Sequence, residues 1–171
     1  MLVRVSEILE EGLRFEGTDE FPHPFQDPQW ELLGLSLLVE KDHMDVLVRG
    51  RLHAKVPQVC SRCLESFPFV VKADVDTRFA PRPHGRGEEV ELTPADLEVD
   101  FYADDLVDLD RLIETETALG LPMKPLCREE CRGLCHLCGG NRNVNPCACE
   151  VKLLDPRLAA LRQIADRLQP K

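Results

Sequence analysis

Hydrophobic and polar residues alternate along two long neighbouring runs in the first half of the chain. These runs are Trp30–Glu40 and Met44–Val56, both rich in valine and leucine, and the second is interrupted near Gly50. A period of two places successive side chains on opposite faces of a strand. Because the turn-like segment Lys41-Asp42-His43 separates the runs, they are predicted to form an antiparallel hairpin.

Further extended segments flank this hairpin. Alternation over 67–79 predicts another strand, and the runs at 2–5 and 13–16 predict two short ones. The segments 90–92 and 97–102 are candidates for additional short strands. A sheet is therefore predicted to be the main element of the chain.

Three positions combine a capping residue with helical patterning. Ser6 is a candidate cap for a brief helix over 7–11, and Asp108 is predicted as the N-cap of a longer helix. Asp155, with proline at the following position, predicts a last helix. The fold class is therefore α+β, with an antiparallel sheet that is open or curled towards a barrel. Two or three helices and a C-terminal cysteine-rich, zinc-ribbon-like appendage complete the predicted fold.

The charge of the chain is distributed unevenly. Residues 88–116 contain twelve acids and one base, a net charge of −11, whereas residues 122–171 carry nine bases and five acids. The chain is therefore predicted to divide into an α+β domain over 1–121, which includes the acidic segment, and a cysteine-rich metal-binding segment over 122–171, which includes the C-terminal helix.

The cellular compartment follows from the apolar pattern. No run approaches the roughly 18 consecutive apolar residues of a membrane helix, and the first residues turn acidic before a signal-type apolar region could form. No membrane association is predicted, and the protein is expected to be cytoplasmic. Thiols are kept reduced there, so the eight cysteines are expected to bind metal rather than to form disulfides.

Four cysteines near the C-terminus have the spacing of a local metal site. Cys135 and Cys138 form a knuckle followed by two glycines, and Cys147 and Cys149 can complete a tetrahedral set. Zinc suits such a compact loop, but an iron–sulfur cluster is also held by four cysteine thiolates. A set closed by four protein ligands is structural rather than catalytic.

The remaining cysteines are separated widely in the sequence. Cys60 and Cys63 have the spacing of half a site, and Cys127 and Cys131 are the natural partners for the other half. The chain is thus expected to bind one or two zinc ions. The alternative is that Cys60 and Cys63 are core or redox thiols. A redox pair belongs at a helix N-terminus, however, and here a strand is predicted to follow.

The sequence contains no recognisable catalytic motif. Its five histidines lack metalloprotease spacing, it has no glycine-rich phosphate loop, and no serine or cysteine lies in a nucleophile motif. No small-molecule substrate is evident. The protein is therefore predicted not to be an enzyme. A nuclease or redox enzyme would need an open metal position or accessible thiols of low pKa.

Four sequence blocks that contain cysteines form a distinctive pattern. In chain order they are Val59-Cys60-Ser61-Arg62-Cys63-Leu64-Glu65-Ser66-Phe67, Leu121-Pro122-Met123-Lys124-Pro125-Leu126-Cys127, Gly133-Leu134-Cys135-x-x-Cys138-Gly139-x-Asn141-x-Asn143 and Cys147-x-Cys149. Together these blocks resemble the YceD family, which is named for accumulation of the large ribosomal RNA. Two departures from the usual family pattern are His136 in place of proline and Arg142 in place of leucine, and neither removes a thiol.

This resemblance implies a role in synthesis, processing or stability of 23S ribosomal RNA during assembly of the large ribosomal subunit in bacteria. The expected partner is ribosomal RNA or a ribosomal protein of the large subunit. Basic residues of the cysteine-rich segment 122–171 could contact RNA phosphates, whereas the acidic segment 88–116 could attract a basic protein. The alternative is a zinc-ribbon protein-interaction module with a basic partner and no RNA contact.

Overall fold

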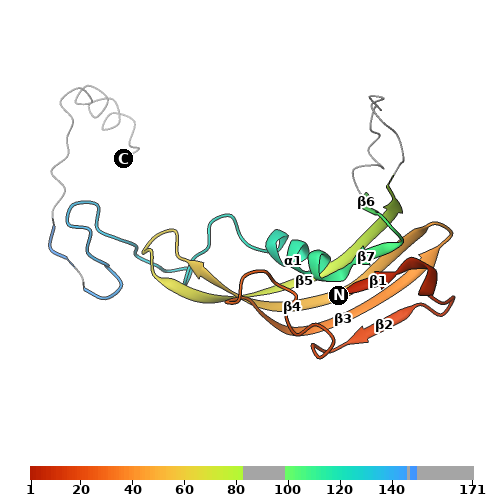
Figure 1. Ribbon diagram of the computed structural model, residues 1–171. Coiled ribbons are helices and arrows are strands. Elements are labelled where there is room, and N and C mark those ends of the chain that lie inside the picture. Colours follow the sequence, from red (N-terminus) through yellow and green to blue (C-terminus); the bar gives the residue numbers. More distant parts are fainter. Residues whose placement is uncertain (83–98, 146, 150–171) are drawn as a thin grey trace, which may run out of the picture. The chain divides into compact units, whose positions relative to one another are not determined.

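The computed structural model describes residues 1–82, 99–145 and 147–149 (Figure 1). The predicted strand at 90–92 and the predicted helix that begins at Asp155 lie outside these ranges. The elements, in chain order, are β1 (Leu2–Arg4), the 3-10 helix η1 (Val5–Glu7), β2 (Leu13–Glu16), β3 (Glu31–Asp42), β4 (Asp45–Val59), β5 (Ser66–Pro81), β6 (Val99–Tyr102), β7 (Leu106–Asp108) and α1 (Leu109–Leu119).

The chain forms two compact units. Residues 1–60 and 65–127 form the first, called the sheet unit below, and residues 61–64 and 128–171 form the second, called the tail unit. The predicted domains 1–121 and 122–171 stay a prediction, because much of the second range lies outside the described residues. Among the residues described, no helix combines the length and apolar character needed to cross a membrane.

The predicted hairpin is confirmed. Strands β3 and β4 pair antiparallel from Glu31 to Asp42, with a two-residue turn after Asp42. His43, in that turn, has a φ of 58°, a backbone conformation typical of tight hairpin turns. The predicted strand over 67–79 is also confirmed, as β5 pairs antiparallel with β4 along its length.

The main sheet is mixed rather than purely antiparallel. It contains five strands in the order β2-β3-β4-β5-β6, and β6 pairs with β5 in parallel. The prediction of a wholly antiparallel sheet is therefore wrong at this edge. A closed barrel is not formed, since β2 and β6 are the two ends of the strand order. Strands β1 and β7 form a separate antiparallel pair.

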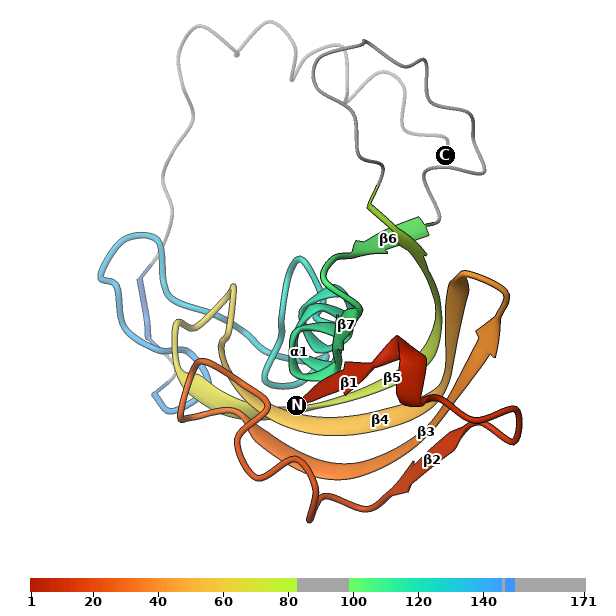
Figure 2. The same cartoon turned by 45° about the vertical axis from the view of Figure 1, so that its right-hand side comes forward.

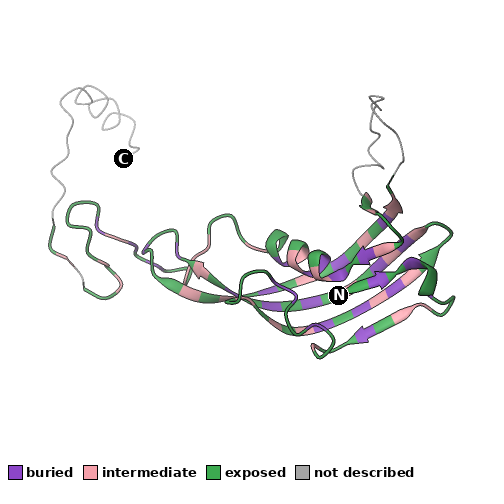
Figure 3. Ribbon diagram, viewed as in Figure 1, coloured by how far each residue is buried: buried purple, intermediate pink, exposed green. Residues whose placement is uncertain are grey.

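One face of the five-stranded sheet carries the hydrophobic core. Helix α1 and the β1–β7 pair lie over this inner face (Figure 2). Alternate residues of β4 point into it and are fully buried, and Leu109 and Ile113 of α1 are buried as well. The side chains on the opposite, outer face alternate with them and are mostly exposed (Figure 3). The inward residues of β4 are Val46, Val48, Leu52, Ala54 and Val56.

Helix α1 is the sole α-helix within the described ranges, where two or three helices were predicted for the whole chain. The predicted helix over 7–11 is wrong, because the 3-10 helix η1 ends at Glu7 and residues 8–11 are not helical. Ser6 does not cap a helix. Its hydroxyl instead donates to the carboxylate of Asp105, which lies in the tight turn between β6 and β7.

The predicted N-cap of α1 is confirmed. The Asp108 carboxylate accepts hydrogen bonds from the backbone N–H groups of Asp110 at 3.1 Å and Arg111 at 3.3 Å. It thereby satisfies donors that have no partner within the first helical turn.

Replacement of this cap is expected to weaken the fold measurably. Asp108→Ala should lower the free energy of unfolding by about 1 kcal/mol, because two helix donors lose their partner. Urea denaturation followed by circular dichroism would measure the change. Asp19→Ala, which removes an exposed carboxylate outside every helix and strand, is the matched control and should be neutral. Equal losses in both variants would contradict the capping role.

Candidate metal centres

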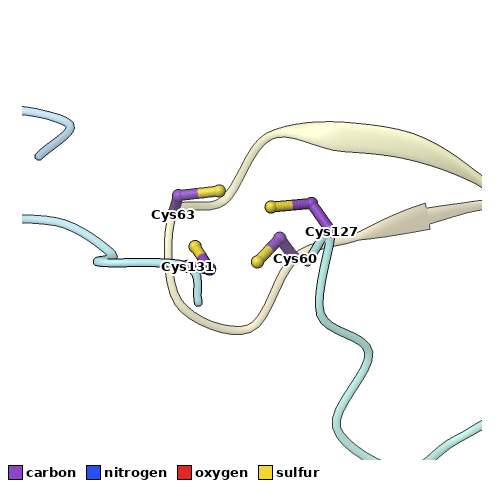
Figure 4. A group of neighbouring side chains, drawn as sticks. All are labelled: Cys60, Cys63, Cys127 and Cys131. Carbon is purple, nitrogen blue, oxygen red and sulfur yellow. The ribbon is translucent and has the colours of Figure 1, made fainter. Parts of the chain in front are cut away.

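Four of the predicted ligands meet in a first cysteine group. The sulfur atoms of Cys60, Cys63, Cys127 and Cys131 all lie within 4.8 Å of one another, and they converge on one point in Figure 4. Cys60 follows the last residue of β4, and Cys63 lies in the loop between β4 and β5. Cys60, Cys63 and Cys131 are at most 4% exposed, so the group is largely shielded from water.

The loop from Cys60 to Glu65 is closed by its own backbone. The N–H of Cys60 donates to the carbonyl of Glu65 at 2.9 Å, and Leu64 adopts a φ of 61°. This tight return brings two thiols to one side of the loop, as the two-residue spacing of the pair predicts.

Within the tail unit, Arg62 is bonded to the segment that follows Cys127. Its guanidinium donates to the carbonyls of Glu129 at 3.0 Å and Cys131 at 3.1 Å. Its own carbonyl accepts from the N–H of Leu134, also at 3.0 Å. The residue between the first two cysteines therefore holds the backbone around Cys131.

Asn143 is a residue whose part in the first group the sequence did not predict. Its side-chain amide donates to the sulfur of Cys131 at 3.3 Å, and its oxygen accepts from the N–H of Arg132 at 2.8 Å. The side chain of Asn141 orients it by accepting from its amide at 2.9 Å. The available signal in the sequence was the Asn-x-Asn spacing next to the knuckle.

Loss of this donor is expected to weaken metal binding in the first group. Asn143→Ala should lower the affinity for one of the bound ions about 10- to 100-fold, because hydrogen bonds to ligand atoms orient them and stabilise the thiolate. Competition with a chromophoric chelator would measure the change. Asn145→Ala is the matched control, since Asn145 is exposed and its backbone N–H makes the contact with Asn141. An unchanged affinity in Asn143→Ala would refute this role.

The other four predicted ligands meet in a second cysteine group. The sulfur atoms of Cys135, Cys138, Cys147 and Cys149 likewise lie within 4.8 Å of one another. The knuckle is closed by a hydrogen bond from the N–H of Gly139 to the carbonyl of Cys135 at 2.8 Å. Gly139 has a φ of 70°, which glycine adopts without strain. This group is more exposed than the first, and Cys138 and Cys149 are on the surface.

The thiols of the second group differ in acidity. The pKa of Cys135 is lowered to about 6, chiefly because the backbone N–H groups of Cys138 and Leu137 donate to its sulfur. The pKa of Cys149 is raised to about 12, first by its hydrogen bond with the Cys138 thiol and then by partial desolvation of the sulfur. Four thiolates cannot crowd together without a cation, so metal binding here must displace protons.

Both groups have dimensions that suit a single metal ion. Four thiolates bound at about 2.3 Å to a tetrahedral zinc ion are about 3.8 Å apart, which agrees with the crowding of the sulfurs in each group. None of the eight cysteines forms a disulfide. The predicted ligands are therefore gathered four and four, and each group could hold one ion.

The fold and these two groups define a mixed-sheet protein with a pair of four-cysteine centres able to hold metal ions. The chain belongs to the YceD family, whose model, described as "Large ribosomal RNA subunit accumulation protein YceD", matches residues 48–165. The resemblance that the cysteine blocks indicated is thereby confirmed.

Similar proteins occur in mycobacteria. The chain is 35% identical over 133 residues to an uncharacterized protein of Mycobacterium tuberculosis and to one of Mycobacterium bovis, with 78% of this chain and 62% of each relative covered. It is 32% identical over 114 residues to an uncharacterized protein of Mycobacterium leprae, with 67% of this chain and 51% of the relative covered. The chain thus spans less than two thirds of these relatives. No solved structure matches it.

Proposed function

We propose that the protein is a zinc-binding, non-enzymatic factor of the cytoplasm that supports synthesis, processing or stability of 23S ribosomal RNA during biogenesis of the large ribosomal subunit. The observation that carries this proposal is membership of the YceD family, whose description names accumulation of the large ribosomal RNA subunit. Its partner would be ribosomal RNA or a ribosomal protein of the large subunit.

Zinc is supported by the chemistry and compactness of the cysteine groups. Four thiolates are a common ligand set of structural zinc, which prefers tetrahedral coordination. In a polynuclear iron–sulfur cluster the thiolates bind different iron atoms and are held farther apart than around one ion. Sulfurs that all lie within 4.8 Å of one another therefore favour a mononuclear site.

A non-enzymatic role is supported by the closure of these sites. If all four thiolates of a group bind one ion, no coordination position is left for a substrate or an activated water. The ions would then stabilise the loops that carry the cysteines. Their contribution is structural, because metal binding can supply folding energy to small segments with little core of their own.

A protein partner remains the second candidate because of the acidic side chains around α1. Among the described residues 99–119, seven acids accompany Arg111 as the single base. Such a surface would steer a basic protein towards the inner-face side of the sheet unit. The acids are Asp100, Asp104, Asp105, Asp108, Asp110, Glu114 and Glu116.

Capture in cells would test the proposed function. The full-length tagged protein should be crosslinked by ultraviolet light, purified under denaturing conditions and analysed for bound RNA and proteins. Enrichment of 23S ribosomal RNA or of large-subunit ribosomal proteins is the expected result. Recovery of basic proteins without RNA would favour the interaction module. Capture of neither ribosomal RNA nor ribosomal proteins would overturn the proposal.

A further inference from the structure

The central strand β4 carries a row of basic side chains on the outer face of the sheet. Its inward residues are buried, and the outward positions between 49 and 55 are occupied by Arg49, Arg51, His53 and Lys55 in succession. The side chains of Arg49, Arg51 and Lys55 are 54%, 79% and 47% exposed. Alternate residues of a strand lie about 6.8 Å apart, so the row is regular and reaches over about 20 Å.

A hollow of about 640 Å³ lies beside this row, over strands β2, β3 and β4. Gly34 and Ser36 of β3 lie next to the row, because they pair with His53 and Arg51 respectively, and both residues are small. Arg14 of β2 lines the hollow from the other side, together with Glu16. The hollow is therefore lined by three arginines and a histidine, with one carboxylate among them.

The ion pairs of this row are of the kind that an anionic ligand can displace. On the β5 side, Arg49 contacts Asp76 at 3.2 Å and Arg51 contacts Asp74 at 3.8 Å. Both carboxylates are more than three quarters exposed, and exposed pairs contribute about 0–1 kcal/mol. Glu40 lies 3.9 Å from Arg49, and Glu31 lies 3.0 Å from Lys55.

The acidic side chains around α1 lie on the other side of the sheet from the row. Helix α1 covers the inner face (Figure 2), whereas the row and the hollow are on the outer face. A polyanion approaching the outer face would meet the basic row together with its ion-pair partners Glu31, Glu40, Asp74 and Asp76, and would keep the sheet between itself and most of the acids around α1. The repulsion that the net charge of −10 suggests for the whole chain is therefore weaker on this face.

We infer that the outer face of the sheet, along the outward row of β4 and its adjoining hollow, binds the phosphate backbone of single-stranded RNA. A linear row of cations beside a groove is the arrangement that follows a nucleic-acid strand. The outward positions of β4 and β5 carry no phenylalanine, tyrosine or tryptophan for base stacking, so contacts are made to phosphates and base preference is weak. This inference rests on the proposed function and assigns its RNA contact.

Fluorescence anisotropy with a labelled single-stranded RNA of about 12 nucleotides tests the inference. The full-length, metal-loaded protein should be titrated between about 50 and 200 mM salt. The triple variant Arg14→Gln, Arg51→Gln, Lys55→Gln loses up to three phosphate contacts. Its salt slope should fall by about 2, and its affinity should fall roughly 100-fold at 0.1 M salt.

A matched control removes the same charge elsewhere in the sheet unit. The variant Arg4→Gln, Lys41→Gln, Arg111→Gln changes exposed cations outside the hollow and should retain most of the affinity. A variant that is expected to bind RNA more tightly provides a further check, because a misfolded protein would not gain affinity. Glu16→Gln removes the carboxylate from the hollow and should tighten binding about fivefold at 0.1 M salt, equivalent to one phosphate contact.

The outcomes separate this inference from the proposed function. Equal losses in the two triple variants, or an unchanged salt slope in the first, would overturn the outer-face site. Binding of poly-glutamate but not of RNA by the wild-type protein would also overturn this site. If crosslinking in cells still recovers ribosomal RNA or ribosomal proteins, the proposed function survives those results. If crosslinking in cells captures neither ribosomal RNA nor ribosomal proteins, the proposed function is refuted, even where the hollow binds RNA in vitro.

Discussion

Replacement of Cys60 by serine is expected to remove one of two metal ions per chain. Its sulfur is fully buried within the first group, so the variant leaves three thiolates around a site built for four. Binding of structural zinc by four ligands contributes about 10–16 kcal/mol in small peptides at neutral pH. Even a fraction of this free energy exceeds the effect of an ordinary surface substitution. The thermal unfolding midpoint should therefore fall markedly as well.

Native mass spectrometry of the intact protein would count the ions and identify the metal. The matched variant is Cys138→Ser, which removes a surface thiol from the second group and should also leave one ion. The double variant should bind none. Two ions retained in Cys60→Ser would show that the first group is not a metal site, and iron in the wild-type protein would overturn the assignment of zinc.

The second large effect is expected at Gly50, where an added side chain would clash with the backbone of β3. A Cβ atom at this position would lie 1.9 Å from the carbonyl oxygen of Ser36 and 2.9 Å from the Cα of Leu37. These are backbone atoms of a paired strand, so neither can rotate away. Gly50→Ala should therefore lower the free energy of unfolding by about 3 kcal/mol, the upper range for overpacking. Urea denaturation would measure this loss.

Gly34→Ala is the control for this experiment. Gly34 lies in the neighbouring strand β3, but an added Cβ would meet no atom within 4 Å. Its substitution should change the free energy of unfolding by no more than about 0.5 kcal/mol. Similar losses in both variants would contradict the close approach at Gly50 as the cause of the effect.

The local features of the fold could be predicted because short-range chemistry determines them. The hairpin of β3 and β4 follows from alternation on both sides of a short turn, and the cap at Asp108 follows from a carboxylate before an amphipathic segment. The four-and-four division of the cysteines follows from ligand spacing, and the structure gathers the sulfurs in that way. Metal occupancy itself stays a prediction.

The features that were missed depend on contacts between distant residues. Strand β6 pairs in parallel with β5, and β1 pairs with β7 across more than a hundred residues. Segments of three or four residues have too few positions for periodicity to reveal a pairing partner. Ser6 illustrates the same limit. Its capping pattern is sound locally, but the carboxylate of Asp105 competes for its hydroxyl.

The two cysteine groups differ in the length of chain that each must enclose. The second group spans only Cys135 to Cys149, whereas 63 residues lie between Cys63 and Cys127 in the first. At a synthesis rate of about 5–20 residues per second, Cys127 is added roughly 3 to 13 s after Cys63. During this interval the nascent chain carries two metal-binding thiols whose partners do not yet exist. The first group can therefore be completed only after synthesis has reached Cys131, and its early pair has to remain reduced until then.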